Sequence, residues 1–305
     1  RRKLSKEHEV VVVSPNRNYQ WVPSNIWVGI GRMKSDEVFF PLEPLYKRKG
    51  IGYKQAKVIS FHPEGDATET KGFVTIEYIF CFNAGVQEKV NYDYLINATG
   101  PKLAFELTEG LNPGTNKAYS VCTYEHAAHA SEALLKLIGD IKTSDKKAKI
   151  LIGTGHAKAT CQGAAFEYIL NVEKELVRYG VRDKIELTWI SNENELGDFG
   201  MDGMLLTYGN QTLKSSELVE MVFADHGIKW ILGAGVFKID EGKAHYENLE
   251  GEYKEEDFDF AMLIPSFSGH GFKAFDKNEN DITDKLFKGF MIVDADYTSK
   301  PYEEW

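Results

Sequence analysis

The sequence has few cysteines and no long run of apolar residues. Its three cysteines are spread over 305 residues, and none forms a Cys-x-x-Cys pair, which argues against a disulfide-stapled module and against a metal site. No stretch approaches the roughly 20 consecutive apolar residues of a membrane-spanning helix. Any thiol chemistry must therefore be local and catalytic, or absent.

Basic charge is also scarce. The chain has 36 Lys and Arg against 46 Asp and Glu, a net charge of −10. Proteins that bind a phosphate backbone need clustered Lys and Arg to displace counterions, so we expect no nucleic-acid partner. The 43% of apolar residues are sufficient for two domains, each with a core.

The first residues are unusual for a doubly wound α/β fold. Residues 9–14 (EVVVVS) are typical of a buried parallel strand, yet only a short charged segment precedes them. Such folds usually open with a strand, a glycine-rich turn and a helix. We therefore expect that the first strand and its turn lie outside this sequence.

Apolar periodicity predicts two α/β units. The elements expected in the first are a helix over 42–48, strands over 52–54 and 56–61, an antiparallel β excursion over 72–82 and a buried strand over 92–101. The elements expected in the second are helices over 124–137, 163–179 and 215–226, and strands over 149–152, 185–190, 228–232, 235–239 and 257–264. The βαβ order of the second unit predicts a parallel sheet of its own.

Five motifs then occur in an order that resembles a known family. They are PSNIWVG at 23–29, YDYLINATGP at 92–101, CTYEHA at 122–127, ATCQGAAFEY at 159–168 and IPSF at 264–267. Together they resemble the sulfide:quinone oxidoreductases, which are FAD flavoproteins of the disulfide reductase superfamily. The two cysteine motifs are the specific part of this resemblance.

The resemblance implies two Rossmann-like, doubly wound α/β domains, the second inserted into the first, with the first FAD strand and turn missing. It places the first part of an FAD-binding domain at 1–115, a degenerate NAD(P)-domain-like unit at 116–283 and the return to the FAD domain at 284–305.

The activity implied is the transfer of two electrons from sulfide through FAD to a quinone, while sulfur accumulates on cysteine. A segment beyond the C-terminus would hold the enzyme on a membrane surface as a peripheral protein and would carry a third active cysteine. A homo-oligomer is compatible with this design.

Cys161 is the first catalytic candidate. It lies where the helix predicted at 163–179 begins, and free backbone N–H groups and the helix dipole favour a thiolate there. A small buried residue at a strand–helix junction is the alternative interpretation. The resemblance favours the catalytic role.

The loop before Cys161 argues against a nicotinamide cofactor. Gly153 and Gly155 form a Gly-x-Gly pair, but the third glycine of a dinucleotide-binding turn does not follow three residues later. We therefore expect no NADH in the second domain, which separates the chain from type II NADH dehydrogenases of similar architecture.

The resemblance also implies a role for Cys122, which precedes a helix that Thr123 can cap. The matching cysteine of the family is active, and in some members it is bound to the flavin. Cys81 lies in the predicted strand at 72–82, so we expect it to be a packed apolar side chain.

His126 and Glu167 are candidate proton-transfer residues. His126 follows Cys122 by one helical turn, and its imidazole could take a proton from hydrogen sulfide or deliver one to quinone. Glu167 lies six residues after Cys161 on one predicted helix and could act as a base. An ordinary core or surface role is the alternative for each.

Further residues are candidates for contacts with FAD or quinone. Ser14 ends a strand where an acidic residue often binds ribose hydroxyls, and a serine weakens that expectation. The other positions that match the family's FAD contacts are Pro23, Asn25, Val58, Thr99, Gly100, Pro101 and Cys122. Pro265 and Phe267 match positions near the quinone or flavin. Plain turn, strand or core roles remain alternatives for all of them.

Two other functions remain open. The chain could come from the flavoprotein subunit of a flavocytochrome c sulfide dehydrogenase, which passes electrons to a haem partner. It could also be a flavin-free binding or interaction domain.

Overall fold

The computed structural model describes residue 4 and residues 7–294, and these form two compact units. The first unit contains residues up to 18, residues 41–102 and residues from 268 onward, and the second contains residues 19–40 and 103–267. The observed divisions therefore differ from those predicted at 115 and 283. Residues 19–40, expected in the FAD-binding part, group with the second unit.

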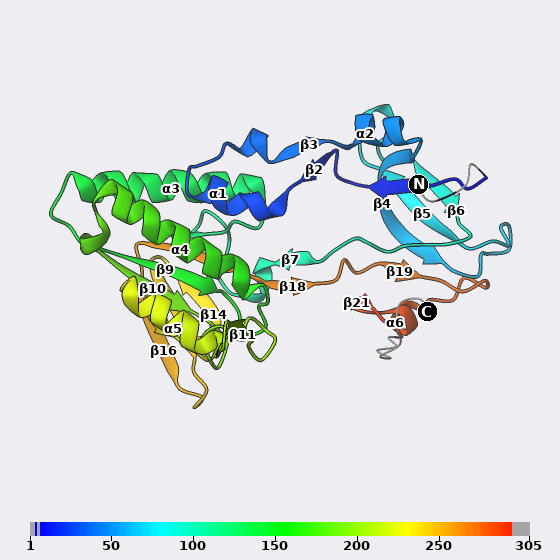
Figure 1. The fold of residues 1–305 in the computed structure, drawn as a ribbon. Coiled ribbons are helices and arrows are strands. Elements are labelled where there is room, and N and C mark those ends of the chain that lie inside the picture. Colours follow the sequence, from blue (N-terminus) through cyan, green and yellow to red (C-terminus); the bar gives the residue numbers. More distant parts are fainter. Residues whose placement is uncertain (1–3, 5–6, 295–305) are drawn as a thin grey trace. The chain divides into compact units, whose positions relative to one another are not determined.

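A parallel sheet of five strands organises the second unit (Figure 1). The order across the sheet is β13 (Lys229–Ile231), β10 (Ile185–Ile190), β9 (Ala148–Thr154), β17 (Phe260–Ile264) and β8 (Ala118–Tyr119). Each neighbouring pair is parallel. The predicted parallel sheet of this unit is thus confirmed.

Both faces of this sheet are covered. The helices on one face are α3 (Tyr124–Lys142), α4 (Gln162–Tyr179) and α5 (Ser215–Asp225), and a short helix, α1 (Asn25–Gly29), lies beside α3 (Figure 1). The opposite face carries an antiparallel sheet of β14 (Gly235–Asp240), β15 (Lys243–Glu247) and β16 (Tyr253–Asp257).

Strand β9 shows how the two faces are filled. Ile150 and Ile152 pack in the core on the helical side, whereas Leu151 packs in the core shared with β14 and β15. Successive side chains of a strand point to opposite faces, so a continuous apolar run suits a strand that is covered on both sides.

The first unit has a mixed sheet. Its strand order is β1 (Val11–Ser14), β4 (Gly52–His62), β5 (Phe73–Tyr78) and β6 (Gln87–Asn91), and β19 (Lys273–Ala274) also pairs with β4. β1 and β19 run parallel to β4, whereas β5 and β6 continue the sheet antiparallel. Its core includes Phe61, Ile76, Ala274 and Phe287.

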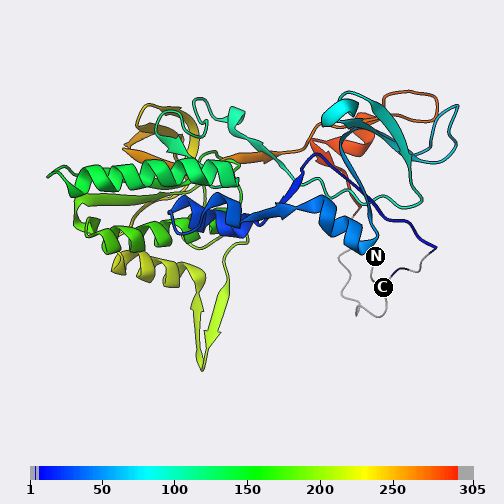
Figure 2. The ribbon, with the colours of Figure 1, turned by 90° about the horizontal axis from the view of Figure 1, so that it is seen from above.

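The remaining elements are short. Those with most residues in the first unit are helices α2 (Leu42–Lys49) and α6 (Thr283–Leu286) and strands β20 (Phe287–Lys288) and β21 (Phe290–Met291). The others are the strand pairs β2 (Asn18–Gln20) with β3 (Phe39–Pro41), β7 (Lys102–Ala104) with β18 (Ser266–Ser268), and the hairpin of β11 (Leu205–Tyr208) and β12 (Gln211–Lys214), which projects from the second unit (Figure 2). Among the described residues, no helix is both long enough and apolar enough to cross a bilayer.

Some predicted strands were wrong. The strands expected at 52–54 and 56–61 are one strand, β4, with an irregularity between Val58 and Ser60. The single strand expected at 257–264 covers parts of two strands in the structure, namely the last residue of β16 and all of β17. The hairpin of β11 and β12 and strand β15 were not predicted.

The segment 92–101 forms no strand, although its sequence predicts a buried one. Tyr94 is 94% exposed and Ile96 is 88% exposed. No described strand pairs with this segment, and an apolar β sequence without a neighbouring strand has no partner for its backbone hydrogen bonds. Propensity alone does not produce a strand there.

Gly153 is required where β9 passes β10. A Cβ atom at this position would lie 1.7 Å from the carbonyl oxygen of Ile190. A Cβ at Gly163, in the first turn of α4, would meet nothing within 4 Å. Gly163 is therefore a suitable control for Gly153 within the same βα unit, because a Cβ atom has space at Gly163 and none at Gly153.

We expect Gly153→Ala to lower the free energy of unfolding by about 3 kcal/mol or more, because the backbone of β10 must move. Gly163→Ala should instead raise it by about 0.5–1 kcal/mol through helix propensity. Chemical denaturation of both variants measures this. Equal free energies of unfolding for the two variants would contradict the close approach of β9 to β10 at Gly153.

Candidate thiol site

Cys122 and Cys161 lie at one edge of the parallel sheet. Cys122 follows β8 and precedes α3, while Cys161 follows β9 and directly precedes α4. Strand β17 runs between β8 and β9, and Pro265 and Phe267 come just after its end. The carboxyl ends of parallel strands meet at the same edge, where ligands of such sheets usually bind. Four predicted residues are thus grouped at three adjacent strand ends.

The two thiols have different surroundings. Cys161 is exposed and Cys122 is half-buried. Burial raises the pKa of the Cys122 thiol to about 11; the Ser120 hydroxyl opposes this rise, and negative charge on Cys161 adds to it. Cys122 is therefore protonated at neutral pH.

Cys161 has an unusual backbone for a residue with a side chain. It is the N-cap of α4 in the left-handed conformation, with φ 73° and ψ 35°, and its side chain makes no capping hydrogen bond. This conformation costs a residue other than glycine about 1–2 kcal/mol. Neighbouring contacts must therefore hold it.

The start of α3 is capped as predicted. Thr123 Oγ1 accepts a hydrogen bond from the backbone N–H of His126 at 3.1 Å. This bond fixes the residue that follows Cys122 and begins the helix that carries His126.

His126 has a partly apolar environment. Its ring lies edge-on to Phe105 with 5.6 Å between centroids, and its buried Nδ1 has no hydrogen-bond partner among the described residues. Desolvation lowers the pKa of His126, Glu125 opposes this effect and His129 adds to it. The imidazole is therefore neutral at pH 7 and able to accept a proton.

Glu167 is not brought to the thiols. It is exposed, and six residues at about 100° each place it about 240° around α4 from Cys161. Ala165, four residues after Cys161, is buried on the side that faces the core. We therefore leave Glu167 out of the site.

The candidate FAD residues fall in both units. Those in the first unit are Ser14, Val58, Thr99, Gly100 and Pro101, and those in the second are Pro23, Asn25 and Cys122. Pro23 is exposed and Val58 is partly buried against the core of the first unit.

The side chain of Asn25 has a structural role. It is 1% exposed, its Nδ2 donates to the carbonyl of Val121 at 3.0 Å, and its Oδ1 accepts a hydrogen bond from Gln20 Nε2 at 2.8 Å. These bonds tie α1 to the residue before Cys122. A buried amide with these partners does not fit a direct polar contact to FAD.

Three residues of the first unit fit a cofactor contact better. Ser14, at the end of β1, accepts a local hydrogen bond from the N–H of Asn16 at 3.2 Å. Thr99 and Gly100 are exposed, and a Cβ at Gly100, where φ is 68°, would meet nothing within 4 Å. An open backbone in this conformation can approach a ligand closely.

Sequence reasoning missed the side chains that hold the Cys161 loop. Asn192, Gln162 and Ser266 each hydrogen-bond to carbonyls of residues 157–159. Asn192 and Ser266 each come two residues after the end of a parallel strand, and polar residues at such strand ends were the available signal.

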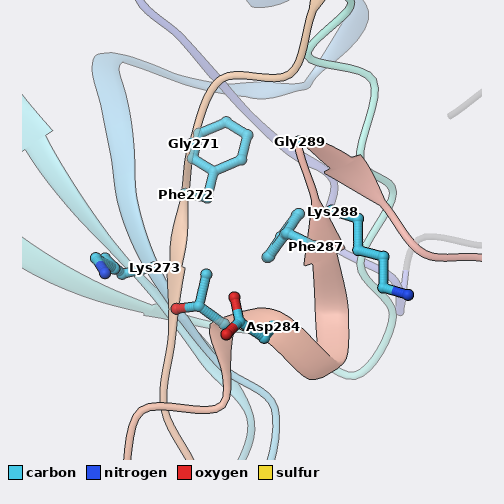
Figure 3. A pocket seen from close by; sticks show the side chains of 8 residues that line it. Gly271, Phe272, Lys273, Asp284, Phe287, Lys288 and Gly289 are labelled. Carbon is cyan, nitrogen blue, oxygen red and sulfur yellow. The ribbon is translucent and has the colours of Figure 1, made fainter.

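A pocket of about 550 Å³ lies elsewhere, within the first unit. The rings of Phe272 and Phe287 face it, with Asp284 below them, whereas Lys288 points away (Figure 3). None of the predicted site residues lines it. Its walls offer few converging polar groups, so it is a weaker candidate for chemistry than the thiol site.

Comparisons with known proteins agree with the motifs. No protein-family model matches the chain. Over 268 residues the chain is 30% identical to the sulfide-quinone reductase of Aquifex aeolicus, a match that covers 88% of this chain and 55% of that protein. The X-ray structure of the A. aeolicus sulfide:quinone oxidoreductase matches with a TM-score of 0.73 at 30% identity, over 88% of this chain and 55% of that one.

The chain resembles the sulfide:quinone oxidoreductases in both sequence and fold. The mitochondrial sulfide:quinone oxidoreductase of Dictyostelium discoideum is 23% identical over 278 residues, which cover 88% of this chain and 52% of that protein. The predicted family resemblance and the α/β fold class of the disulfide reductase type are confirmed. The chain spans about half the length of these sulfide:quinone oxidoreductases.

We expect iodoacetamide to label Cys161 well before Cys122 at pH 7.5. A pKa of about 11 in place of the ordinary 9.0 lowers the thiolate fraction of Cys122 about a hundredfold, and the thiolate is the form that reacts. Labelling of Cys122 should accelerate as the pH rises toward 11. Peptide mass spectrometry resolves the two sites, and equal rates at pH 7.5 would contradict the assignment.

Proposed function

We propose that this chain is part of a sulfide:quinone oxidoreductase in which Cys161 binds the sulfur of sulfide. The observation that carries the proposal is the placement of an exposed Cys161 and a protonated Cys122 at one sheet edge, together with 30% identity to a sulfide-quinone reductase. Substrate and electron acceptor are inferred from that relative.

The two cysteines would divide the work. Cys161 is accessible to a small anion such as hydrosulfide, and it lies at the N-terminus of α4, where negative charge is stabilised. Cys122 carries its proton at neutral pH, so its S–H group is suited to donate a hydrogen bond to sulfur held at Cys161. His126, neutral at pH 7, would accept a proton as hydrogen sulfide is consumed.

FAD would be held in the first unit by Ser14, Thr99 and Gly100 and would supply the two-electron acceptor between sulfide and quinone. The lengthened loop between Gly155 and Gly163 lacks the glycine spacing of a dinucleotide site. We therefore propose that the second unit binds no nicotinamide. Pro265 and Phe267, beside the thiol edge, are the residues proposed to lie near the quinone or the flavin.

A quinone acceptor implies work at a membrane surface, because quinones with apolar tails partition into the bilayer. The proposal is therefore a peripheral membrane enzyme. A haem protein as electron acceptor is the alternative, and it is tested by the choice of acceptor in the assay.

The protein, purified with any segments that its gene encodes on either side of residues 1–305, should be yellow and should bleach when sulfide is added anaerobically. Cys161→Ser should lower sulfide-dependent quinone reduction by at least about a hundredfold, because the nucleophile is removed. Flavin absorbance and a quinone-reduction assay measure both effects.

Cys81→Ser is the control. The side chain of Cys81 lies outside those that the structure describes. Its backbone begins a short 3-10 helix (Cys81–Asn83) after β5 and is not in a strand as predicted. The variant should keep its activity. A colourless preparation, or equal activity of the Cys161→Ser and Cys81→Ser variants, would refute the proposal. Reduction of cytochrome c without quinone reduction would favour the haem alternative.

A further inference from the structure

The backbone of Asn192 joins two strand ends. Asn192 comes two residues after β10 ends at Ile190. Its N–H donates to Thr154 Oγ1, at the end of β9, at 3.0 Å. The carboxyl ends of two neighbouring strands are thereby linked at the edge that carries Cys161.

The side chain of Asn192 ties both flanks of Cys161. Its Nδ2 donates to the carbonyls of Ala157 at 2.9 Å and Ala159 at 3.0 Å, and its Oδ1 accepts a hydrogen bond from Gln162 Nε2 at 3.2 Å. One amide thus binds the residue two before Cys161 and the residue directly after it. Both of its donor hydrogens and its acceptor oxygen are used.

A second contact fixes the same loop from β17. Ala159 forms an isolated antiparallel bridge with Ser266, whose Oγ donates to the carbonyl of Lys158 at 3.4 Å. Gln162, which is 5% exposed, adds a bond from its Nε2 to the Ala159 carbonyl at 3.3 Å. Cys161 itself takes no part in this network, so its left-handed backbone is imposed by its neighbours.

Strained backbone persists only where surrounding contacts over-determine it, and it is concentrated at functional sites. We propose that Asn192 is a positioning residue whose amide holds the 157–162 loop, so that Cys161 keeps its left-handed conformation and presents its thiol at the start of α4. The proposal rests on the proposed function only in that it treats Cys161 as the reactive thiol.

The test compares the alkylation rates of Cys161 and Cys122 in the same sample. In Asn192→Asp the shape is kept, but carboxylate oxygens face the carbonyls of Ala157 and Ala159 and repel them. Asn192→Ala removes the bonds without adding charge. The control Asn194→Asp makes the same charge change two residues away, on a side chain that is exposed.

We expect the Cys161 rate to fall roughly fivefold or more in both Asn192 variants, since the thiol leaves its imposed orientation. The rate of Cys122, and both rates in Asn194→Asp, should change less than about twofold. The alkylation rates should be recorded from pH 6 to 9. A change in the orientation of the Cys161 thiol lowers its rate by the same factor at every pH, whereas a change in its ionisation shifts the rate profile along the pH axis.

Gln162→Met, of similar volume, removes the hydrogen bond between Gln162 and Asn192 at the Gln162 end. It should lower the alkylation rate of Cys161 in the same way, so the test remains decisive if an Asn192 variant does not fold. An unchanged Cys161 rate, or a joint rise of both cysteine rates that indicates general loosening, would overturn the proposal. So would an equal fall in Asn194→Asp. None of these outcomes depends on sulfide or quinone, so the proposed function fails or stands separately.

Discussion

The close passage of β9 and β10 is the constraint on which the thiol site depends. The carbonyl of Ile190 lies so close to Gly153 that no Cβ atom fits at this position. Strand β9 is also buried between the helices and the sheet of β14–β16. Because both of its faces are packed against other elements, β9 is held in one position in the sheet. The loop that leaves it toward Cys161 therefore starts from a fixed point, and the bond from Asn192 to Thr154 is possible only because the two strand ends are adjacent.

The two cysteines illustrate how one sheet edge creates different chemistries. Cys122 comes after a two-residue edge strand, and its partial burial raises its pKa. Cys161 comes after the central strand on a loop that opens to solvent. A protonated thiol and an accessible thiol at one sheet edge therefore differ in reactivity, because the thiolate is the form that reacts.

Much of this could be predicted from sequence because the signals are local. Strand β10 was predicted with its observed bounds, and α4 and α5 within one residue at each end, since apolar periodicity and capping residues act over a few positions. The placement of both cysteines before helices also follows from local order. Strand pairing does not, because it depends on a partner far away in the chain, and segment 92–101 shows strand propensity without forming a strand.

The sequence by itself determined the parallel sheet of the second unit, the order of its elements and the thiols at its edge. The tertiary structure alone decided which polar groups meet there. Glu167 lies on the helix that Cys161 caps but points elsewhere. Asn192 is 31 residues away in the chain and ties both flanks of Cys161. Local periodicity fixes the face of a helix, but contacts between strand ends arise only when the sheet has formed, because they join residues that no short-range pattern connects.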